Sequence, residues 1–207
     1  MKQQKLSSEK LKAVFEAILE LINKIENEYT RKSILEMMED LGERYFSAPA
    51  SHRAEFHNCF PGGLAEHTLR VYMILKDLCS KYYPSVSDDT ITIVALLHDL
   101  GKIGDENGDY YVQQTSDWHR DKLGEFYTPN NSIEYFHHSH RSLYLCQAYQ
   151  IPLTAEEFKA IMIHDGQYIE ANRQYANKEG MLSSLLHIAD NLACAIEKEN
   201  YKKFCKD

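Results

Sequence analysis

The chain has 207 residues, of which 23 are Lys or Arg and 31 are Asp or Glu, so its formal net charge is −8. This charge disfavours a duplex nucleic acid as partner, because proteins that hold one normally carry a basic stripe along its phosphates. No stretch reaches the roughly 18 apolar residues needed to cross a bilayer, and residues 1–10 lack the apolar core of a signal peptide. The five cysteines share no CxxC spacing. These features predict a cytoplasmic protein with reduced thiols and no membrane partner.

Apolar residues recur every three or four positions over most of the chain, which predicts helices. The expected helices are 11–25, 30–42, 63–83, 88–100, 138–149, 155–164 and 181–200. Ser7 or Ser8 is expected to cap the first helix and Ser87 the fourth, while Thr154 begins a capping box before the sixth. Gly101 is expected to end the fourth helix as a C′ glycine.

The stretch 104–131 differs from the rest of the chain. It contains Gly108, Gly124 and Pro129 among several aromatic residues, which predicts a β-hairpin or ordered loop. We therefore expect an all-α, single-domain helical bundle with a small β-hairpin-like insertion. Residues 1–50 are expected to form a helical extension packed on a main domain of residues 51–207.

Histidine and aspartate residues occur at three places in predicted helices where exposed polar residues are not expected. The pair His98-Asp99 follows an apolar run at the end of a buried helix, where an unpaired carboxylate is costly. His67 lies within a helix, and Asp190 lies in the amphipathic run 185–190. Imidazole and carboxylate groups together suit divalent Mn, Fe, Co, Ni or Zn, so these residues are candidate metal ligands.

The local sequences around these residues resemble those of the HD-domain phosphohydrolase superfamily, an all-α fold named after its His-Asp doublet. PGGLAEHT at 61–68 resembles the GGL.EHT segment of that superfamily, and LLHDLGK at 96–102 resembles its doublet segment. IAD at 188–190 resembles the segment that supplies its last carboxylate. The resemblance covers about residues 55–198 and implies that one metal ion is bound by His67, His98, Asp99 and Asp190.

A second metal ion would require two further histidines. HSHRS at 138–142 resembles the HGEKS segment of small bacterial and phage HD proteins, and IMIHDG at 161–166 resembles their IRWHMG. This alignment selects His138 and His164 as ligands, with Asp99 bridging the two ions. His140 departs from the pattern, because the related segment has Glu at its position.

Cations near the metal would stabilise the charge that develops on a transferred phosphoryl group. Lys102 is the first candidate, and the resemblance also points to it, while Arg141 is the second. Arg120 and Lys122 are expected to bind the outer phosphates of a nucleotide. Asp99 is expected to be central to catalysis, and no residue is assignable as the leaving-group acid.

The predicted function is metal-dependent hydrolysis of a nucleotide or other small phosphate ester by metal-activated water. Three alternatives stay open: a 3′-to-5′ exonuclease or phosphodiesterase on short oligonucleotides, a diiron HD-type oxygenase, and a nucleotide-binding module without turnover. The exoribonucleases of the superfamily carry an additional β domain, for which the residues before the catalytic segment are too few. Whether the chain forms a homo-oligomer is also left open, as is the role of His187, which either faces the metal or packs in the core.

Overall fold

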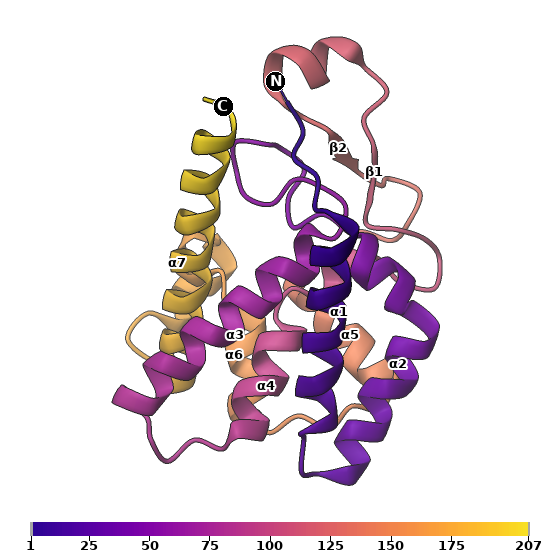
Figure 1. Ribbon diagram of the computed structural model, residues 1–207. Coiled ribbons are helices and arrows are strands. Elements are labelled where there is room, and N and C mark those ends of the chain that lie inside the picture. Colours follow the sequence, from indigo (N-terminus) through magenta and orange to yellow (C-terminus); the bar gives the residue numbers. More distant parts are fainter. Residues whose placement is uncertain (1, 207) are drawn as a thin grey trace.

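The structure, a computed structural model, describes residues 2–206 and consists of helices with one small sheet (Figure 1). The α-helices within these residues are α1 (Ser8–Asn23), α2 (Glu28–Ser47), α3 (Gly63–Tyr82), α4 (Asp88–Leu97), α5 (His138–Ala148), α6 (Ala155–Ile163) and α7 (Met181–Phe204). The shorter helices are η1 (Leu100–Ile103), η2 (His119–Leu123), η3 (Gly166–Tyr168) and η4 (Glu170–Tyr175). The predicted all-α class with a small hairpin-like insertion is confirmed.

The structure confirms the N-cap residues predicted for three helices. Ser7 caps α1 and Ser87 caps α4, each through a side-chain oxygen that accepts from a backbone N–H of the first turn. Thr154 and Glu157 form the predicted capping box of α6. These caps satisfy backbone donors that have no partner within the helix.

The predicted role of Gly101 is wrong. Helix α4 already ends at Leu97, and Gly101 lies in η1 without a left-handed conformation. A Cβ atom there would lie 2.0 Å from the carbonyl oxygen of His138, and the Gly101 N–H donates to Ser142 Oγ at 2.8 Å. The glycine is therefore needed for the close approach of η1 to α5, which brings the first residue of α5 beside the end of α4.

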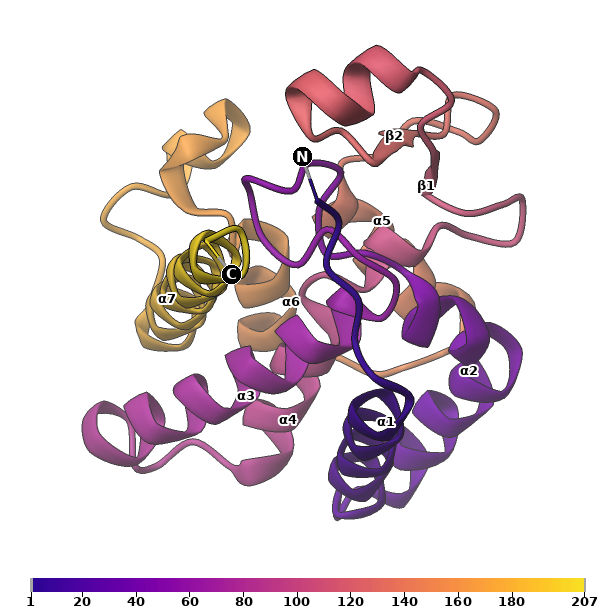
Figure 2. The same ribbon diagram turned by 45° about the horizontal axis from the view of Figure 1, so that its top comes forward.

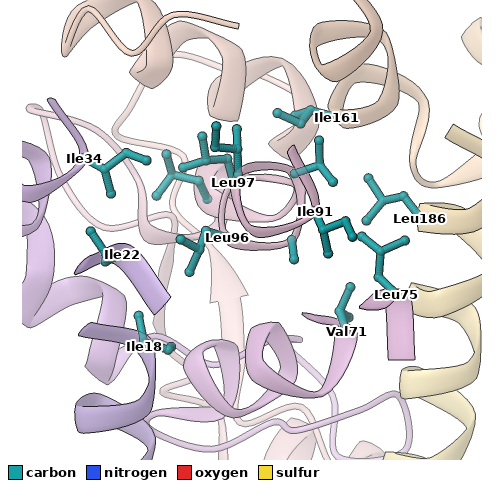
Figure 3. Close-up of a cluster of buried hydrophobic side chains, with 14 of the residues drawn as sticks. Ile18, Ile22, Ile34, Val71, Leu75, Ile91, Leu96, Leu97, Ile161 and Leu186 are labelled. Carbon is teal, nitrogen blue, oxygen red and sulfur yellow. The ribbon is translucent and has the colours of Figure 1, made fainter. Parts of the chain in front are cut away.

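Helix α4 lies at the centre of the hydrophobic core (Figure 3). Its run from Ile91 to Leu97 is buried throughout, so it contacts neighbours on all sides. The surrounding buried side chains come from α1, α2, α3, α6 and α7: Ile18, Ile22, Ile34, Val71, Leu75, Ile161 and Leu186. The two N-terminal helices thus contribute to the same core as the other helices, while the boundary near residue 50 stays a prediction.

The insertion forms the predicted hairpin at one end of the bundle (Figures 1 and 2). Strand β1 (Tyr111–Gln113) pairs antiparallel with β2 (Tyr127–Pro129), and η2 lies between them in the chain. The loop that precedes α3 is joined to the insertion by backbone hydrogen bonds, such as Ala54 N–H to Gly124 O at 2.8 Å. This end of the bundle is therefore covered by the insertion and the loop that precedes α3.

No helix within residues 2–206 is both long and apolar enough to span a membrane.

Candidate metal centre

Several helix ends bring histidines and carboxylates to one place. His98 and Asp99 directly follow α4, His164 directly follows α6, and His138 is the first residue of α5. Two further residues come from within helices: His67 lies in α3 and Asp190 in α7. Residues in or directly after α3, α5, α6 and α7 therefore lie around the end of α4. The six predicted metal ligands are His67, His98, Asp99, His138, His164 and Asp190.

Asp99 lies at the centre of this cluster. Its Oδ2 atom is 3.6 Å from His67 Nε2 and 3.5 Å from His98 Nε2. Its Oδ1 atom is 3.3 Å from His138 Nε2 and 3.3 Å from His164 Nε2. The side chain is only 3% exposed. The two oxygens of one buried carboxylate therefore face two separate pairs of ring nitrogens.

Two further carboxylates complete the arrangement. Asp190 Oδ1 is 3.1 Å from His67 Nε2, while Asp165 Oδ2 is 3.2 Å from His138 Nε2. We call the space facing Asp99 Oδ2 the first position and the space facing Asp99 Oδ1 the second position. The first position is bordered by His67, His98, Asp99 and Asp190, and the second by Asp99, His138, His164 and Asp165.

The other ring nitrogen of three of these histidines is held by the protein. The Nδ1 atoms of His98 and His164 each lie 2.8 Å from the carbonyl oxygen three residues earlier. His67 Nδ1 lies 3.1 Å from the carboxylate of Glu197, which is buried. A proton on Nδ1 in these contacts leaves Nε2 with a free electron pair directed at the cluster, as metal-binding histidines require.

Five buried side-chain atoms of the cluster have no hydrogen-bond partner among the described residues. Such atoms normally cost about 1–3 kcal/mol each and are rare in folded proteins. Here they gather around one carboxylate and consist of imidazole nitrogens and carboxylate oxygens, which are the ligand atoms of divalent transition metals. The residues present therefore fit a metal centre. The atoms are His67 Nε2, His98 Nε2, Asp99 Oδ1, His138 Nε2 and Asp165 Oδ2.

The pKa values of the clustered histidines shift in different directions, because burial lowers the pKa of His98 to about 4 while neighbouring carboxylates raise those of His67 and His164. Burial lowers the pKa of His67, but the carboxylates of Glu197 and Asp190 outweigh burial and raise it to about 10. Burial likewise opposes the Asp165 and Asp99 carboxylates at His164, and the net result is a pKa raised to about 9. These two rings hold protons at neutral pH where a bound metal ion would replace them.

Lys102 lies beside Asp99. Its Nζ atom is 2.6 Å from Asp99 Oδ2, and the side chain is 9% exposed. Burial lowers the pKa of Lys102, but the Asp99 carboxylate outweighs that effect and raises it, so the amine keeps its charge. Lys102 also lines a cavity of about 370 Å³ together with Arg44, Asp109, Tyr111 and Tyr127. Lys102 thus lies between the clustered ligands and a cavity beside the insertion.

Arg141 is not brought to the cluster. Its guanidinium pairs with the buried carboxylate of Asp105 and donates to the carbonyl oxygen of Glu134 at 2.6 Å. It also lies over the rings of Tyr110 and Phe136, at 5.7 and 5.3 Å from their centroids. Among the described residues, no hydrogen bond or ion pair joins Arg141 to the metal ligands. Its contacts hold the insertion on α5.

The two cations predicted to bind outer phosphates lie in η2 of the insertion. Arg120 pairs with Asp117 and donates to the carbonyl oxygen of Gln114, and Lys122 is exposed. No contact links either side chain to the metal ligands within residues 2–206. His187, whose role the sequence leaves open, has its Nδ1 atom 2.7 Å from the carbonyl oxygen of His164 and so supports the backbone of the second position.

Sequence reasoning missed two carboxylates of this site. Glu197 lies two helical turns after Asp190 on the same face of α7, so helical periodicity could have identified it. Asp165 belongs to a second His-Asp pair in the sequence, which is uninformative as a dipeptide until the ends of α4 and α6 are seen to meet.

Comparison with known proteins agrees with this geometry. The family model named HD domain matches residues 64–193, which is 130 of the 207 residues and includes all six predicted metal ligands. No curated protein and no solved structure matches the chain. Since the matched part exceeds half of the chain, the protein belongs to the HD-domain family of metal-dependent phosphohydrolases.

Proposed function

We propose that this protein hydrolyses a nucleotide or other small phosphate ester with two divalent transition-metal ions. The observation that carries the proposal is that the two oxygens of Asp99 face two separate histidine pairs. The proposed ligands are His67, His98, Asp99 and Asp190 at the first position and Asp99, His138 and His164 at the second. Mn, Fe, Co, Ni and Zn suit this donor set.

Metal ions bound there would supply a hydroxide nucleophile at neutral pH and neutralise phosphate oxygens. The Glu197 carboxylate contacts the Nδ1 atom of His67. This contact fixes the ring and would make its Nε2 atom a stronger metal ligand. Lys102 keeps a positive charge next to Asp99 and is positioned to stabilise negative charge on the transferred phosphoryl group. In this proposal Arg141 positions the insertion rather than contacting the substrate.

The cavity beside Lys102 is our proposed substrate pocket. Its volume of about 370 Å³ lies in the range of small-molecule sites, which run from about 300 to 1,000 Å³. Tyr111 and Tyr127 supply aromatic surface in its lining, and Arg44 lies there paired with Asp109 at 3.2 Å. The size of the pocket and the net charge of −8 favour a small substrate over a polymer. Arg120 and Lys122 remain proposed contacts for outer phosphates.

His57 is a further proposed substrate contact. Its ring centroid is 5.0 Å from that of His67, and its buried Nε2 atom has no hydrogen-bond partner among the described residues. Burial holds the pKa of His57 well below its usual value, so the ring is neutral at pH 7. A neutral imidazole carries one N–H that can donate to a phosphate oxygen.

The test is chromatography of the hydrolysis products formed by protein reconstituted with each candidate metal. The substrates are nucleoside mono-, di- and triphosphates, dinucleotides, a cyclic dinucleotide and a short oligonucleotide, with Asp99→Asn as the inactive control. Metal-dependent turnover that Asp99→Asn abolishes supports the proposal, and the preferred substrate identifies the reaction class. Oxygen consumption by the ferrous protein without hydrolysis of any phosphate ester would instead support the oxygenase alternative and overturn the proposal.

A further inference from the structure

The carboxylate of Asp165 lies against the second position. Its Oδ2 atom is 3.2 Å from His138 Nε2 and 3.6 Å from His164 Nε2. The same atom is 3.9 Å from His137 Nδ1. It is buried and has no hydrogen-bond partner among residues 2–206. Asp165 thus directs an unsatisfied oxygen toward the same ring nitrogens that face Asp99 Oδ1.

The backbone holds Asp165 in this place. His164 and Asp165 continue the helical conformation of α6, with φ, ψ of −58°, −29° and −63°, −8°. Gly166 then reverses the chain with a φ of +67°, and a Cβ atom there would lie 2.4 Å from the ring of His187. Since that ring in turn contacts the carbonyl oxygen of His164 at 2.7 Å, the doublet is fixed by packing on α7.

The ion-pair partners of Asp165 are all imidazoles. They are His137, His138 and His164, with no Lys or Arg among them in the described part of the chain. Among those residues, no permanently charged side chain therefore compensates the Asp165 carboxylate.

A metal ion at the second position would lie beside this carboxylate. An imidazole binds a metal ion as the neutral ring, so His138 and His164 carry no charge that could balance Asp165 once they are ligands. A mostly buried carboxylate without an opposite charge is costly. The cost disappears if the carboxylate binds the incoming ion directly.

We propose that Asp165 is a metal ligand at the second position, together with Asp99, His138 and His164. The inference rests on the proposed binuclear centre and adds a carboxylate to it. It does not follow from the motif resemblance, because the IRWHMG segment has Met where this chain has Asp165. With two carboxylates and two imidazoles, the second position gains hard oxygen ligands that suit Mn²⁺ and Fe²⁺.

The first test is a Mn²⁺ titration of metal-free protein, followed by the disappearance of the free-Mn²⁺ electron paramagnetic resonance signal. Wild-type protein should bind two ions per chain, and Asp165→Asn should bind one with unchanged affinity and the other at least about 10-fold more weakly. Glu170→Gln is the matched control, since it removes an exposed carboxylate from the neighbouring η4 and should bind both ions as wild type does.

The outcomes separate this inference from the proposed function. If Asp165→Asn binds both ions as tightly as wild type, the inference is overturned while the binuclear centre stands. If wild-type protein binds no Mn²⁺ and no other candidate metal, the proposed function and the inference both fail.

A second measurement distinguishes a direct ligand from a residue that only positions His138. Asp165→Cys places a thiolate where the carboxylate lies, and a bound Co²⁺ ion should then show a near-ultraviolet thiolate-to-cobalt charge-transfer band. The experiment uses a Cys194→Ser background, because Cys194 Sγ is 3.5 Å from Asp190 Oδ1. Glu170→Cys in the same background should lack the band. An Asp165→Cys protein that binds Co²⁺ without the band would overturn the inference.

Discussion

Two His-Asp doublets follow two helices of this protein, and the histidine of each lies within 3.5 Å of the Asp99 carboxylate. His98-Asp99 follows α4 and His164-Asp165 follows α6. In each doublet the histidine Nδ1 contacts the carbonyl oxygen three residues earlier at 2.8 Å. The aspartates differ. Asp99 is 3% exposed and paired with Lys102 at 2.6 Å, whereas Asp165 is 22% exposed and, among the described residues, pairs with histidines alone.

The negative charge of Asp99 is thus compensated by a side chain of the protein itself. The charge of Asp165 depends on what binds beside it. Lys102 balances the charge of Asp99 whether or not a metal ion is present, so the first doublet is electrostatically stable on its own. Asp165 has only imidazoles as ion-pair partners among the described residues and, in our proposal, is balanced by the ion at the second position. The first doublet should therefore govern the whole centre, and the second only one of its two ions.

Substitution of Asp99 should have the largest effect, since both positions depend on it. Asp99→Asn should lose both ions and lower turnover by roughly a thousandfold or more, because several kcal/mol of transition-state stabilisation depend on the metal. Elemental analysis and the hydrolysis assay measure the two losses. A variant with wild-type metal content and turnover would show that the doublet is structural.

Substitution of His164 should affect the second position alone. His164→Ala is expected to lower the metal count from two ions to one, because His67, His98 and Asp190 still border the first position. Elemental analysis of the purified variant checks this, with His140→Ala as the control for an exposed histidine. Retention of two ions would remove His164 from the ligand set.

Substitution of Lys102 should separate charge stabilisation from metal binding. Lys102→Ala leaves every proposed ligand in place, so metal content should stay unchanged. Turnover should fall by roughly 10²- to 10³-fold, which is the usual effect of removing one group that stabilises transition-state charge. Steady-state kinetics on metal-loaded protein is the measurement, and wild-type kinetics would exclude Lys102 from the reaction.

Glu197 supports the first position from behind His67. Glu197→Gln keeps the shape of the side chain but removes its charge, so metal affinity at the first position should fall by about 10- to 100-fold. A metal titration measures this effect. The second position should bind its ion as before, and equal weakening of both ions would contradict the separation of the two positions.

Metal binding should also release protons. At pH 7.5, below the raised pKa values of about 10 for His67 and about 9 for His164, both rings are protonated in the metal-free protein. About two protons should therefore leave per chain on metal binding, and affinity should weaken as the pH falls. Calorimetry in two buffers of different ionisation enthalpy counts the protons. Binding without proton release would be inconsistent with protonated rings in the metal-free site.

Much of the architecture could be predicted because local signals agree with it. The caps at Ser7 and Ser87 and the capping box at Thr154 mark helix starts through contacts within one turn. The HD-domain motifs also selected the six histidines and aspartates that the fold brings together, although their roles as ligands stay predictions. Gly101 was misread, because its reason is a close approach to α5 rather than a helix end.

The remaining parts of the site depend on packing that no local pattern reveals. Glu197 looks like a solvated residue of an amphipathic helix until α3 packs on α7 and buries it against His67. Arg141 follows His138 by three residues, which suggested a role in the centre, yet its guanidinium pairs with Asp105 of the insertion. The position of Asp165 beside the cluster follows only from the fold, in which the ends of α4 and α6 lie next to each other.

The most direct test of the account is the number of transition-metal ions per chain, measured by elemental analysis on gently purified protein without a histidine tag. We expect about two ions per wild-type chain, at the positions facing the two oxygens of Asp99. One ion per chain would contradict the binuclear centre, and none after reconstitution with each candidate metal would contradict the metal-dependent reaction itself.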